Sequence, residues 1–205
     1  MSKFVLLLKK LYYNFQIRKD SVKGLDFFDN ENFKEDNYDS SISVHYEPSR
    51  TGFELIFKGL QITPHDNLID IGCGKGKAVV MLSKLPFGAV DGYDISEELC
   101  EVAKRNIANL GIRNSHIFCA NALEFDEYDK YTYFYLYNPV PEAVFEVVFD
   151  NILKSVNRVA RKIHIININP KYSHIILRNK EFKLVNELKS YVFKYVAHHY
   201  SNEIK

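Results

Sequence analysis

The hydrophobic and polar positions of this chain change period repeatedly between residue 48 and the C-terminus. Short, nearly continuous apolar runs are typical of strands that are buried on both faces. Such runs predict strands at residues 68–71, 89–94, 116–119, 132–137 and 163–168. Two more apolar runs, at 182–188 and 191–197, flank Lys189-Ser190 and predict an antiparallel hairpin.

Helical spacing of apolar residues fills the intervals between these strands. It predicts helices through residues 53–60, 77–85, 97–110 and 144–156. Ser96 is the expected N-cap of the third helix, and Pro141 is well placed to open the fourth. Helices that alternate with strands imply parallel pairing. We therefore expect an α/β fold: a Rossmann-like, doubly wound, mostly parallel seven-stranded sheet with an antiparallel C-terminal hairpin strand, preceded by N-terminal helices.

The first 47 residues have a different character. Residues 3–18 combine apolar residues at helical spacing with lysines and an arginine, and residues 26–41 form an acidic stretch without a clear period. The basic helix either docks on the domain or makes a weak contact with a membrane surface or a partner through residues 1–20. The apolar run Phe4–Leu8 is too short for a signal peptide or a membrane span. The expected organisation is an N-terminal helix and cap segment at 1–47, followed by one domain at 48–205.

Composition and charge exclude few classes of protein or binding partner. Hydrophobic residues make up 46% and charged residues 26% of the 205 residues, as in ordinary globular proteins. The net charge of +1 gives no strong signal for nucleic acid, although it leaves a local basic patch open. Three cysteines without CxxC spacing predict reduced thiols and a cytoplasmic protein. The histidines show no metal-ligand spacing, so we expect no metal.

A glycine-rich turn follows the first predicted strand, with the sequence Asp70-Ile-Gly-Cys-Gly-Lys-Gly76. Glycines allow a sharp turn and let a ligand approach the backbone, and the next helix offers N–H groups at its start. Lys77 stands where a dinucleotide-binding fingerprint needs a third small residue, and the Gly-Lys-Ser/Thr of a P-loop is missing. The turn therefore fits neither of these two motifs.

This turn resembles the first motif of class I S-adenosylmethionine-dependent methyltransferases, an acidic residue followed by G-x-G-x-G. The resemblance covers about residues 48–198 in element order. It implies that S-adenosyl-L-methionine is the cofactor and that Asp70, Gly72 and Gly74 line its methionine part.

The same resemblance extends to the ends of the second and third strands. It implies that Asp94 binds the ribose hydroxyls and that Ile95 packs on the adenine, with Asp91 as the weaker competitor for the ribose. Asn121 and Ala122, after the third strand, are expected to contact the adenine through a side chain and a backbone N–H.

The fourth strand ends in Asn138-Pro139, where this family places its reaction chemistry. The pair resembles half of the Asp/Asn-Pro-Pro-aromatic motif of enzymes that methylate amide or exocyclic amine nitrogens, and it implies that Asn138 and Pro139 orient an acceptor nitrogen. Val140 replaces the second proline and no aromatic residue follows, which argues against nucleobase or glutamine acceptors. Asn138 is also expected to contact the cofactor.

A segment before the domain, Tyr46-Glu-Pro-Ser49, is similar to one found in small prokaryotic relatives of non-SET protein-lysine methyltransferases. The similarity implies that Tyr46, Ser49 and Thr51 close the cofactor pocket and that the acceptor is an amine such as a protein lysine. Two alternatives stay open: a small-molecule or glycan O-methyltransferase, and a cofactor-binding subunit without catalysis. The acceptor, a protein or a small molecule, is not identified by the sequence.

Two further expectations concern side chains outside the motifs. Four tyrosines alternate along residues 131–137 and are expected on one face of a buried strand. His198-His199 is expected to end the last strand in solvent.

Overall fold

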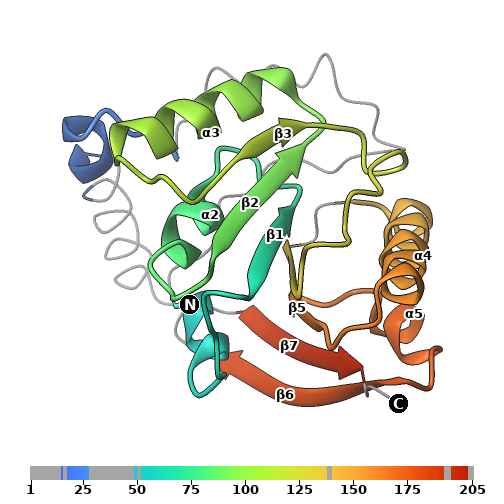
Figure 1. Ribbon diagram of the computed structural model, residues 1–205. Helices are drawn as coiled ribbons and strands as arrows, with labels where there is room; N and C mark the ends of the chain where they lie inside the picture. Colours follow the sequence, from blue (N-terminus) through green and yellow to red (C-terminus); the bar gives the residue numbers. More distant parts are fainter. Residues whose placement is uncertain are drawn as a thin grey trace.

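The computed structural model describes residues 15, 18–27, 49, 52–137, 140–191 and 195–202. Its centre is a seven-stranded sheet in the order β3-β2-β1-β4-β5-β7-β6 (Figure 1). The strands are β1 Asn67–Ile71, β2 Ala89–Asp94, β3 Ile117–Cys119, β4 Tyr133–Tyr137, β5 His164–Ile168, β6 Phe182–Ser190 and β7 Tyr195–Asn202. The first five strands pair in parallel, and β7 is antiparallel to both of its neighbours. The predicted fold class is therefore confirmed.

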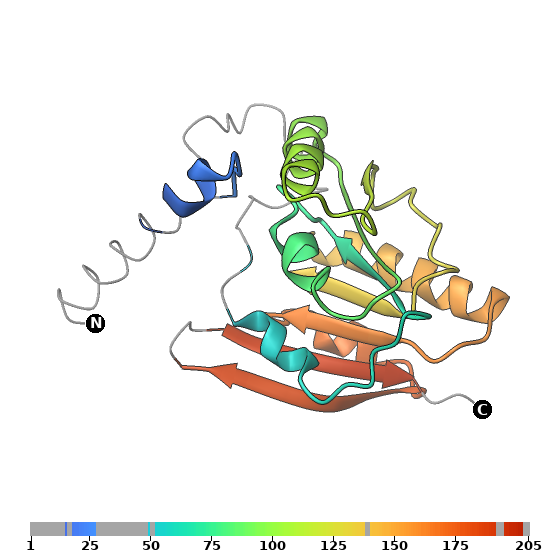
Figure 2. The same cartoon turned by 60° about the vertical axis from the view of Figure 1, so that its left-hand side comes forward.

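Helices cover both faces of this sheet (Figures 1 and 2). They are η2 Phe53–Phe57, α2 Lys77–Leu82, α3 Glu97–Asn109, α4 Glu142–Arg158 and α5 Ser173–Leu177. One apolar core joins the sheet to η2, α2 and α3, and a second joins it to α4 and α5. The predicted caps are confirmed, since Ser96 Oγ accepts a hydrogen bond from the Leu99 N–H at 3.3 Å and Pro141 directly precedes α4.

Two local predictions were wrong, and one short helix was missed. The segment after residue 52 is a 3-10 helix of five residues rather than an α-helix, and Leu55 is 55% exposed. The short helix α5 was missed, because its five residues are too few to show a period. The hairpin turn lies later than expected: Ser190 still pairs with Tyr195, so Lys189 and Ser190 belong to β6.

The buried side chains also differ from the expectation at two places. Tyr133 and Tyr135 share the core that contains α2 and α3, but Tyr131 precedes β4 and lies in the other core. His199 is 1% exposed and does not end the last strand, because β7 continues to Asn202 and places it between β5 and β6.

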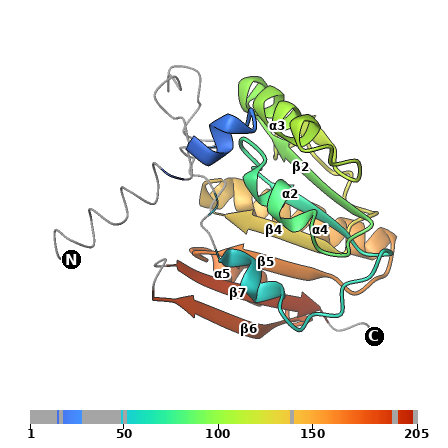
Figure 3. The ribbon, with the colours of Figure 1, turned by 90° about the vertical axis from the view of Figure 1, so that its left-hand side faces the viewer.

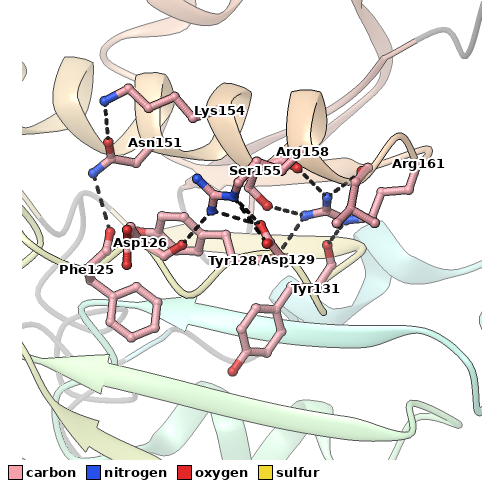
Figure 4. A network of polar contacts seen from close by, with 11 residues as sticks. Phe125, Asp126, Tyr128, Asp129, Tyr131, Asn151, Lys154, Ser155, Arg158 and Arg161 are labelled. Carbon is pink, nitrogen blue, oxygen red and sulfur yellow. Dashed lines mark hydrogen bonds and ion pairs between the residues drawn. The ribbon is translucent and has the colours of Figure 1, made fainter.

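The connection between β3 and β4 is held against the C-terminal end of α4 by side-chain hydrogen bonds (Figure 4). Arg161 donates to the carbonyl oxygens of Tyr131 and Tyr128, each at 2.8 Å, and to Ser155 Oγ at 2.8 Å. Arg158 pairs with Asp129 at 2.9 Å. This network fixes the connection that begins with the predicted adenine contacts.

Part of the N-terminal prediction falls outside the described residues, including most of the basic helix at 3–18 and of the acidic stretch. Residues 18–22 are helical, and the segment 18–27 lies beside α3 and α2 (Figure 3). Within the described ranges, no helix has the length and apolarity needed to cross a membrane.

Candidate active site

The glycine turn joins β1 to α2 at the carboxyl end of the sheet. Gly72 and Gly74 have φ angles of 72° and 52°, a left-handed backbone conformation that residues other than glycine rarely adopt. The N–H groups of Gly72 and Cys73 both donate to the Tyr93 carbonyl at 2.9 Å, which ties the turn to the end of β2. The glycine pattern in the sequence therefore reflects a backbone requirement.

Asp94, the last residue of β2, braces this turn. One carboxylate oxygen accepts the Gly74 N–H at 2.9 Å, and the other accepts the Ser96 N–H at 3.0 Å. The side chain is almost completely buried, and burial raises its pKa despite these hydrogen bonds. Asp94 thus holds the turn and presents a carboxylate at its edge.

Asp70 lies one residue before the end of β1 and is 3% exposed. Burial raises its pKa well above the usual range, and the nearby Asp94 carboxylate raises it further. Two carboxylates buried so close together favour a ligand that brings positive charge or hydrogen-bond donors.

Ser49 reaches this region from the segment before the domain. Its hydroxyl lies 3.4 Å from the Tyr135 hydroxyl, and Tyr135 pairs with Asp70 across the β1–β4 ladder. The side chain of Tyr135 also contacts the Phe53 ring, with centroids 5.0 Å apart. The structure therefore brings Ser49 next to the carboxyl ends of β1 and β4.

Asp91, the competitor for the ribose role, has other partners. It is fully buried and accepts hydrogen bonds from the Tyr131 hydroxyl at 2.7 Å, Lys130 Nζ at 3.0 Å and the His116 N–H at 3.0 Å. It also lies three residues before Asp94 in β2, away from the turn. The Asp91 carboxylate is occupied by hydrogen bonds within the protein. Asp94 is therefore the better candidate for a contact with a ligand.

The residues predicted at the adenine lie after β2 and β3. Ile95 is 36% exposed beside the turn, whereas Ala122 is buried in the core that includes α4. Asn121 Oδ1 accepts the Leu123 N–H at 3.0 Å. This bond gives Asn121 a role in its own turn and leaves part of its acceptor capacity for a ligand.

A polar cluster behind the glycine turn was missed in the sequence. Lys75, inside the turn, is buried and pairs with Asp26 at 2.7 Å. Asn106 of α3 donates to the carbonyl oxygens of Lys75 and Asp26, at 2.9 and 3.0 Å, and accepts the Asp26 N–H at 2.9 Å. The cluster anchors the N-terminal segment to the turn. A polar residue on the apolar face of α3 was the signal that could have revealed it.

The cysteines of the site are thiols. Burial raises the pKa of Cys73 well above the usual range and that of Cys100 to about 12. Neither is therefore a thiolate nucleophile at neutral pH. In the described part of the chain, no group of three His, Cys, Asp or Glu side chains is arranged to hold a metal ion.

Four predicted site residues lie outside the described residues: Tyr46, Thr51, Asn138 and Pro139. Chain connectivity nevertheless puts Asn138 directly after Tyr137, the last residue of β4. Because β4 pairs in parallel with β1, that end of β4 adjoins the end of β1 that carries the glycine turn.

The described residues suit a zwitterionic nucleoside such as S-adenosylmethionine. The turn has no side chains at Gly72 and Gly74 that would block a close approach to the backbone. Asp70 and Asp94 place buried carboxylates within the same corner, where an ammonium group or vicinal hydroxyls would compensate them.

Comparison with known proteins agrees with this arrangement. Residues 68–162 match the family model described as "Methyltransferase domain". A release factor glutamine methyltransferase of Bacteroides thetaiotaomicron is 37% identical over 67 residues, which cover 30% of this chain and 24% of that protein. The chain thus matches about a quarter of the length of this curated relative.

Two solved structures share the fold. An RNA methyltransferase of Salinibacter ruber, in complex with S-adenosyl-L-homocysteine, has a TM-score of 0.60 and 13% identity, covering 78% of this chain and 95% of that one. The ribosomal protein L11 methylase of Lactobacillus delbrueckii subsp. bulgaricus has a TM-score of 0.56 and 17% identity, covering 73% and 72%. At these identities the likeness concerns the fold.

Proposed function

Because residues 68–162 form a methyltransferase domain of the class I, S-adenosylmethionine-dependent type, we propose that this protein transfers a methyl group to a nitrogen acceptor, in particular an amine such as a protein lysine. The nitrogen assignment is supported by the sequence pair Asn138-Pro139, which follows Tyr137, the last residue of β4. The described end of β4 adjoins the end of β1 that carries the glycine turn. An acceptor held there lies next to a cofactor held by the turn.

The cofactor residues take the roles that their positions suggest. Asp94 binds the ribose hydroxyls, and Asp70 faces the positive charge of the methionine amine, which offsets the cost of its own burial. Ile95, Asn121 and Ala122 contact the adenine. The raised pKa of Asp70 supports such a cationic partner, because an ammonium group nearby would restore the ionised carboxylate.

Methyl transfer from this cofactor requires mainly that the acceptor be positioned correctly. S-adenosylmethionine supplies a methyl group on a sulfonium, which is already a strong electrophile. A lysine ammonium would first lose a proton to solvent. The neutral nitrogen would then form a bond to the methyl carbon as the sulfur–carbon bond breaks, which would leave S-adenosylhomocysteine and a protonated methylamine. Asn138 and Pro139 accept hydrogen bonds from the nitrogen and direct its lone pair toward the methyl group.

The choice of an amine rests on the segment that contains Ser49. The segment resembles one in protein-lysine methyltransferases, and the contact of its described residue Ser49 with Tyr135, 3.4 Å between the two hydroxyls, is compatible with a place near the carboxyl ends of β1 and β4. In this proposal Tyr46, Ser49 and Thr51 close the pocket over the cofactor. The relative from Bacteroides thetaiotaomicron is named for a glutamine acceptor, and its matched part covers 30% of this chain.

The proposal is tested by binding and by turnover of the purified protein. Calorimetric titration with S-adenosylmethionine is expected to give micromolar affinity, and incubation with labelled cofactor and lysine-containing peptides to give methylated lysine. Asn138→Ala is expected to lower turnover at least 100-fold, with cofactor affinity changed less than threefold, because the side chain acts on the acceptor. The matched control is Asn169→Gly, at the second Asn-Pro pair, where glycine keeps the positive φ of 50°.

The outcomes separate the alternatives. Equal losses of turnover and affinity in Asn138→Ala would make the residue a cofactor contact. Label found on a hydroxyl of a glycan or small molecule would replace the nitrogen acceptor. Folded protein that binds the cofactor and methylates no acceptor class would be a binding subunit.

A further inference from the structure

Asn106 is a buried polar residue on the side of α3 that contacts the glycine turn. It is 1% exposed, and the other buried residues of α3 are apolar. Burying an amide costs free energy unless its hydrogen-bonding groups find partners. The partners of Asn106 therefore indicate why an asparagine stands at this position.

The side chain of Asn106 makes three hydrogen bonds to the described backbone. Its amide nitrogen donates to the carbonyl oxygens of Lys75 at 2.9 Å and of Asp26 at 3.0 Å, and its amide oxygen accepts the Asp26 N–H at 2.9 Å. Both hydrogens of the amide are thus used. Asn106 joins the glycine turn to the N-terminal segment 18–27, which lies beside α3 (Figure 3).

Lys75 stands between two glycines of the turn, Gly74 and Gly76. Gly76 has a φ of 76°, and because it has no side chain, the Lys75–Gly76 peptide has little steric restriction of its own. Two hydrogen bonds fix this peptide: Asn106 donates to its carbonyl oxygen, and its N–H donates to the Cys73 carbonyl at 2.9 Å. Asn106 thus supplies from α3 a restraint that the glycines of the turn do not provide.

The turn also packs closely against α3. A Cβ atom placed on Gly76 would lie 3.0 Å from Ala103 Cβ. Ala103 and Asn106 are three residues apart in α3 and therefore lie on the same side of the helix. This side of α3 is the surface against which the turn is held.

Asp26 keeps the Asn106 amide in place. Its backbone bonds both ends of that amide, and its carboxylate pairs with Lys75 Nζ at 2.7 Å. The three residues therefore contact one another in pairs, and Asn106 cannot change its rotamer without breaking contacts with both of the others.

We propose that Asn106 is a positioning residue of the cofactor site, which holds the turn in the conformation that binds the methionine part of S-adenosylmethionine. This inference rests on the proposed place of the cofactor at the turn. Gly74, which is expected against the methionine part, directly precedes Lys75, and its N–H is held by Asp94 at 2.9 Å. Asp94 thus restrains the turn from β2, and Asn106 restrains it from α3. A turn restrained in the free protein loses less conformational entropy when the cofactor binds.

The test measures the affinity of the purified full-length protein for S-adenosylmethionine and S-adenosylhomocysteine by calorimetric titration. Asn106→Ala removes the donor to Lys75, and we expect both affinities to fall about tenfold, the factor that corresponds to one lost hydrogen bond. A third ligand, 5′-methylthioadenosine, lacks the amino and carboxyl groups of the methionine part. Its affinity, measured by equilibrium dialysis, is expected to change less than twofold.

Two matched variants separate positioning from stability and from docking of the N-terminal segment. Asn202→Ala removes a buried asparagine that also bonds one backbone N–H and one backbone carbonyl, at Ile163 and Arg161 before β5. Asn109→Ala removes the donor to the Gly24 carbonyl at 2.7 Å, a contact of α3 with the same segment but not with the turn. Both are expected to keep cofactor affinity within twofold, at a temperature where circular dichroism shows every variant folded.

The outcomes decide the role of Asn106. A loss of affinity in Asn106→Ala, with both controls unchanged, would support the proposal. Equal losses in Asn202→Ala would assign the effect to stability, and equal losses in Asn109→Ala would assign it to docking of the segment; either result would overturn the proposal. An unchanged cofactor affinity in Asn106→Ala, or an equal loss for 5′-methylthioadenosine, would also overturn it. Failure of the folded wild type to bind the cofactor would instead contradict the proposed function itself.

Discussion

The glycine turn and the antiparallel pairing of β5 with β7 bury polar side chains in contrasting ways. Beside that pairing, Asn202 Oδ1 accepts the Ile163 N–H at 2.7 Å and its amide donates to the Arg161 carbonyl at 3.1 Å. Ser201 Oγ donates to the Ile163 carbonyl at 2.8 Å. The side chains of Asn202 and Ser201 thus find their hydrogen-bond partners within the protein.

The glycine turn is organised differently. Asp94 is braced by two backbone N–H groups, but burial raises the pKa of both Asp94 and Asp70. Within the described residues, no hydrogen bond from the protein offsets the burial of Asp70. The difference teaches that burial alone does not mark a functional site. A buried carboxylate that no hydrogen bond from the described residues compensates is a better indicator.

The largest expected effect separates two aspartates of the same strand. Asp94→Ala should lower the free energy of unfolding by about 2–4 kcal/mol, because it leaves the Gly74 and Ser96 N–H groups without acceptors. It should also weaken S-adenosylmethionine binding at least tenfold. Urea unfolding and calorimetric titration measure the two quantities.

Asp91→Ala is the control for this experiment. It removes an equally buried carboxylate with three hydrogen-bond donors around it, so a similar loss of stability is expected with cofactor affinity changed less than twofold. If Asp91→Ala weakened binding as much as Asp94→Ala, the assignment of Asp94 to the ribose would be wrong.

A substitution at the β5–β7 pairing should change stability and not cofactor binding. Asn202→Ala leaves the buried Ile163 N–H without its acceptor, and we expect the free energy of unfolding to fall by about 2 kcal/mol. Cofactor affinity should stay within twofold, because the two groups that Asn202 bonds belong to the backbone beside this pairing and not to the glycine turn. A loss of affinity at unchanged stability would contradict the comparison.

The last effect concerns pH. His164 Nδ1 lies 2.8 Å from His199 Nε2, and burial lowers the pKa of each from 6.5 to about 4. The unfolded chain therefore takes up protons between pH 6.5 and pH 4 that the folded protein does not, so stability is fully present above pH 6.5 and decreases as the pH falls.

Because His164 is only half-buried, we expect a decrease of about 2 kcal/mol between pH 7 and pH 4.5 from the pair, measured by urea unfolding. The variant His164→Gln/His199→Gln should show a smaller decrease. An unchanged decrease in the variant would assign the effect to other groups.

The sequence predicted the regular parts of the fold well. The strand β4 is buried on both faces, so its run of aromatic and apolar residues is continuous and ends at Tyr137, near where the pattern ends. The glycine turn was predictable because positive φ angles require glycine at fixed positions.

Long-range polar contacts were not predictable from the pattern. The ion pair of Lys75 with Asp26 joins residues that are 49 positions apart, and each residue alone is an ordinary surface type. His199 was misassigned because the polar sequence at the end of β7 is typical of an exposed strand end, whereas here the strand is inserted between β5 and β6.

The position of β6 at the border of the sheet has a consequence for self-association. An uncovered edge strand offers backbone groups to any passing strand and so invites aggregation. In β6 the register shifts between Leu184 and Asn186, and the exposed positions include Lys183, Glu187 and Lys189 beside the apolar Leu184 and Val185. A bulge and charges at an edge oppose the addition of another strand. The bulge and the charges of β6 thereby oppose pairing with a strand of another molecule.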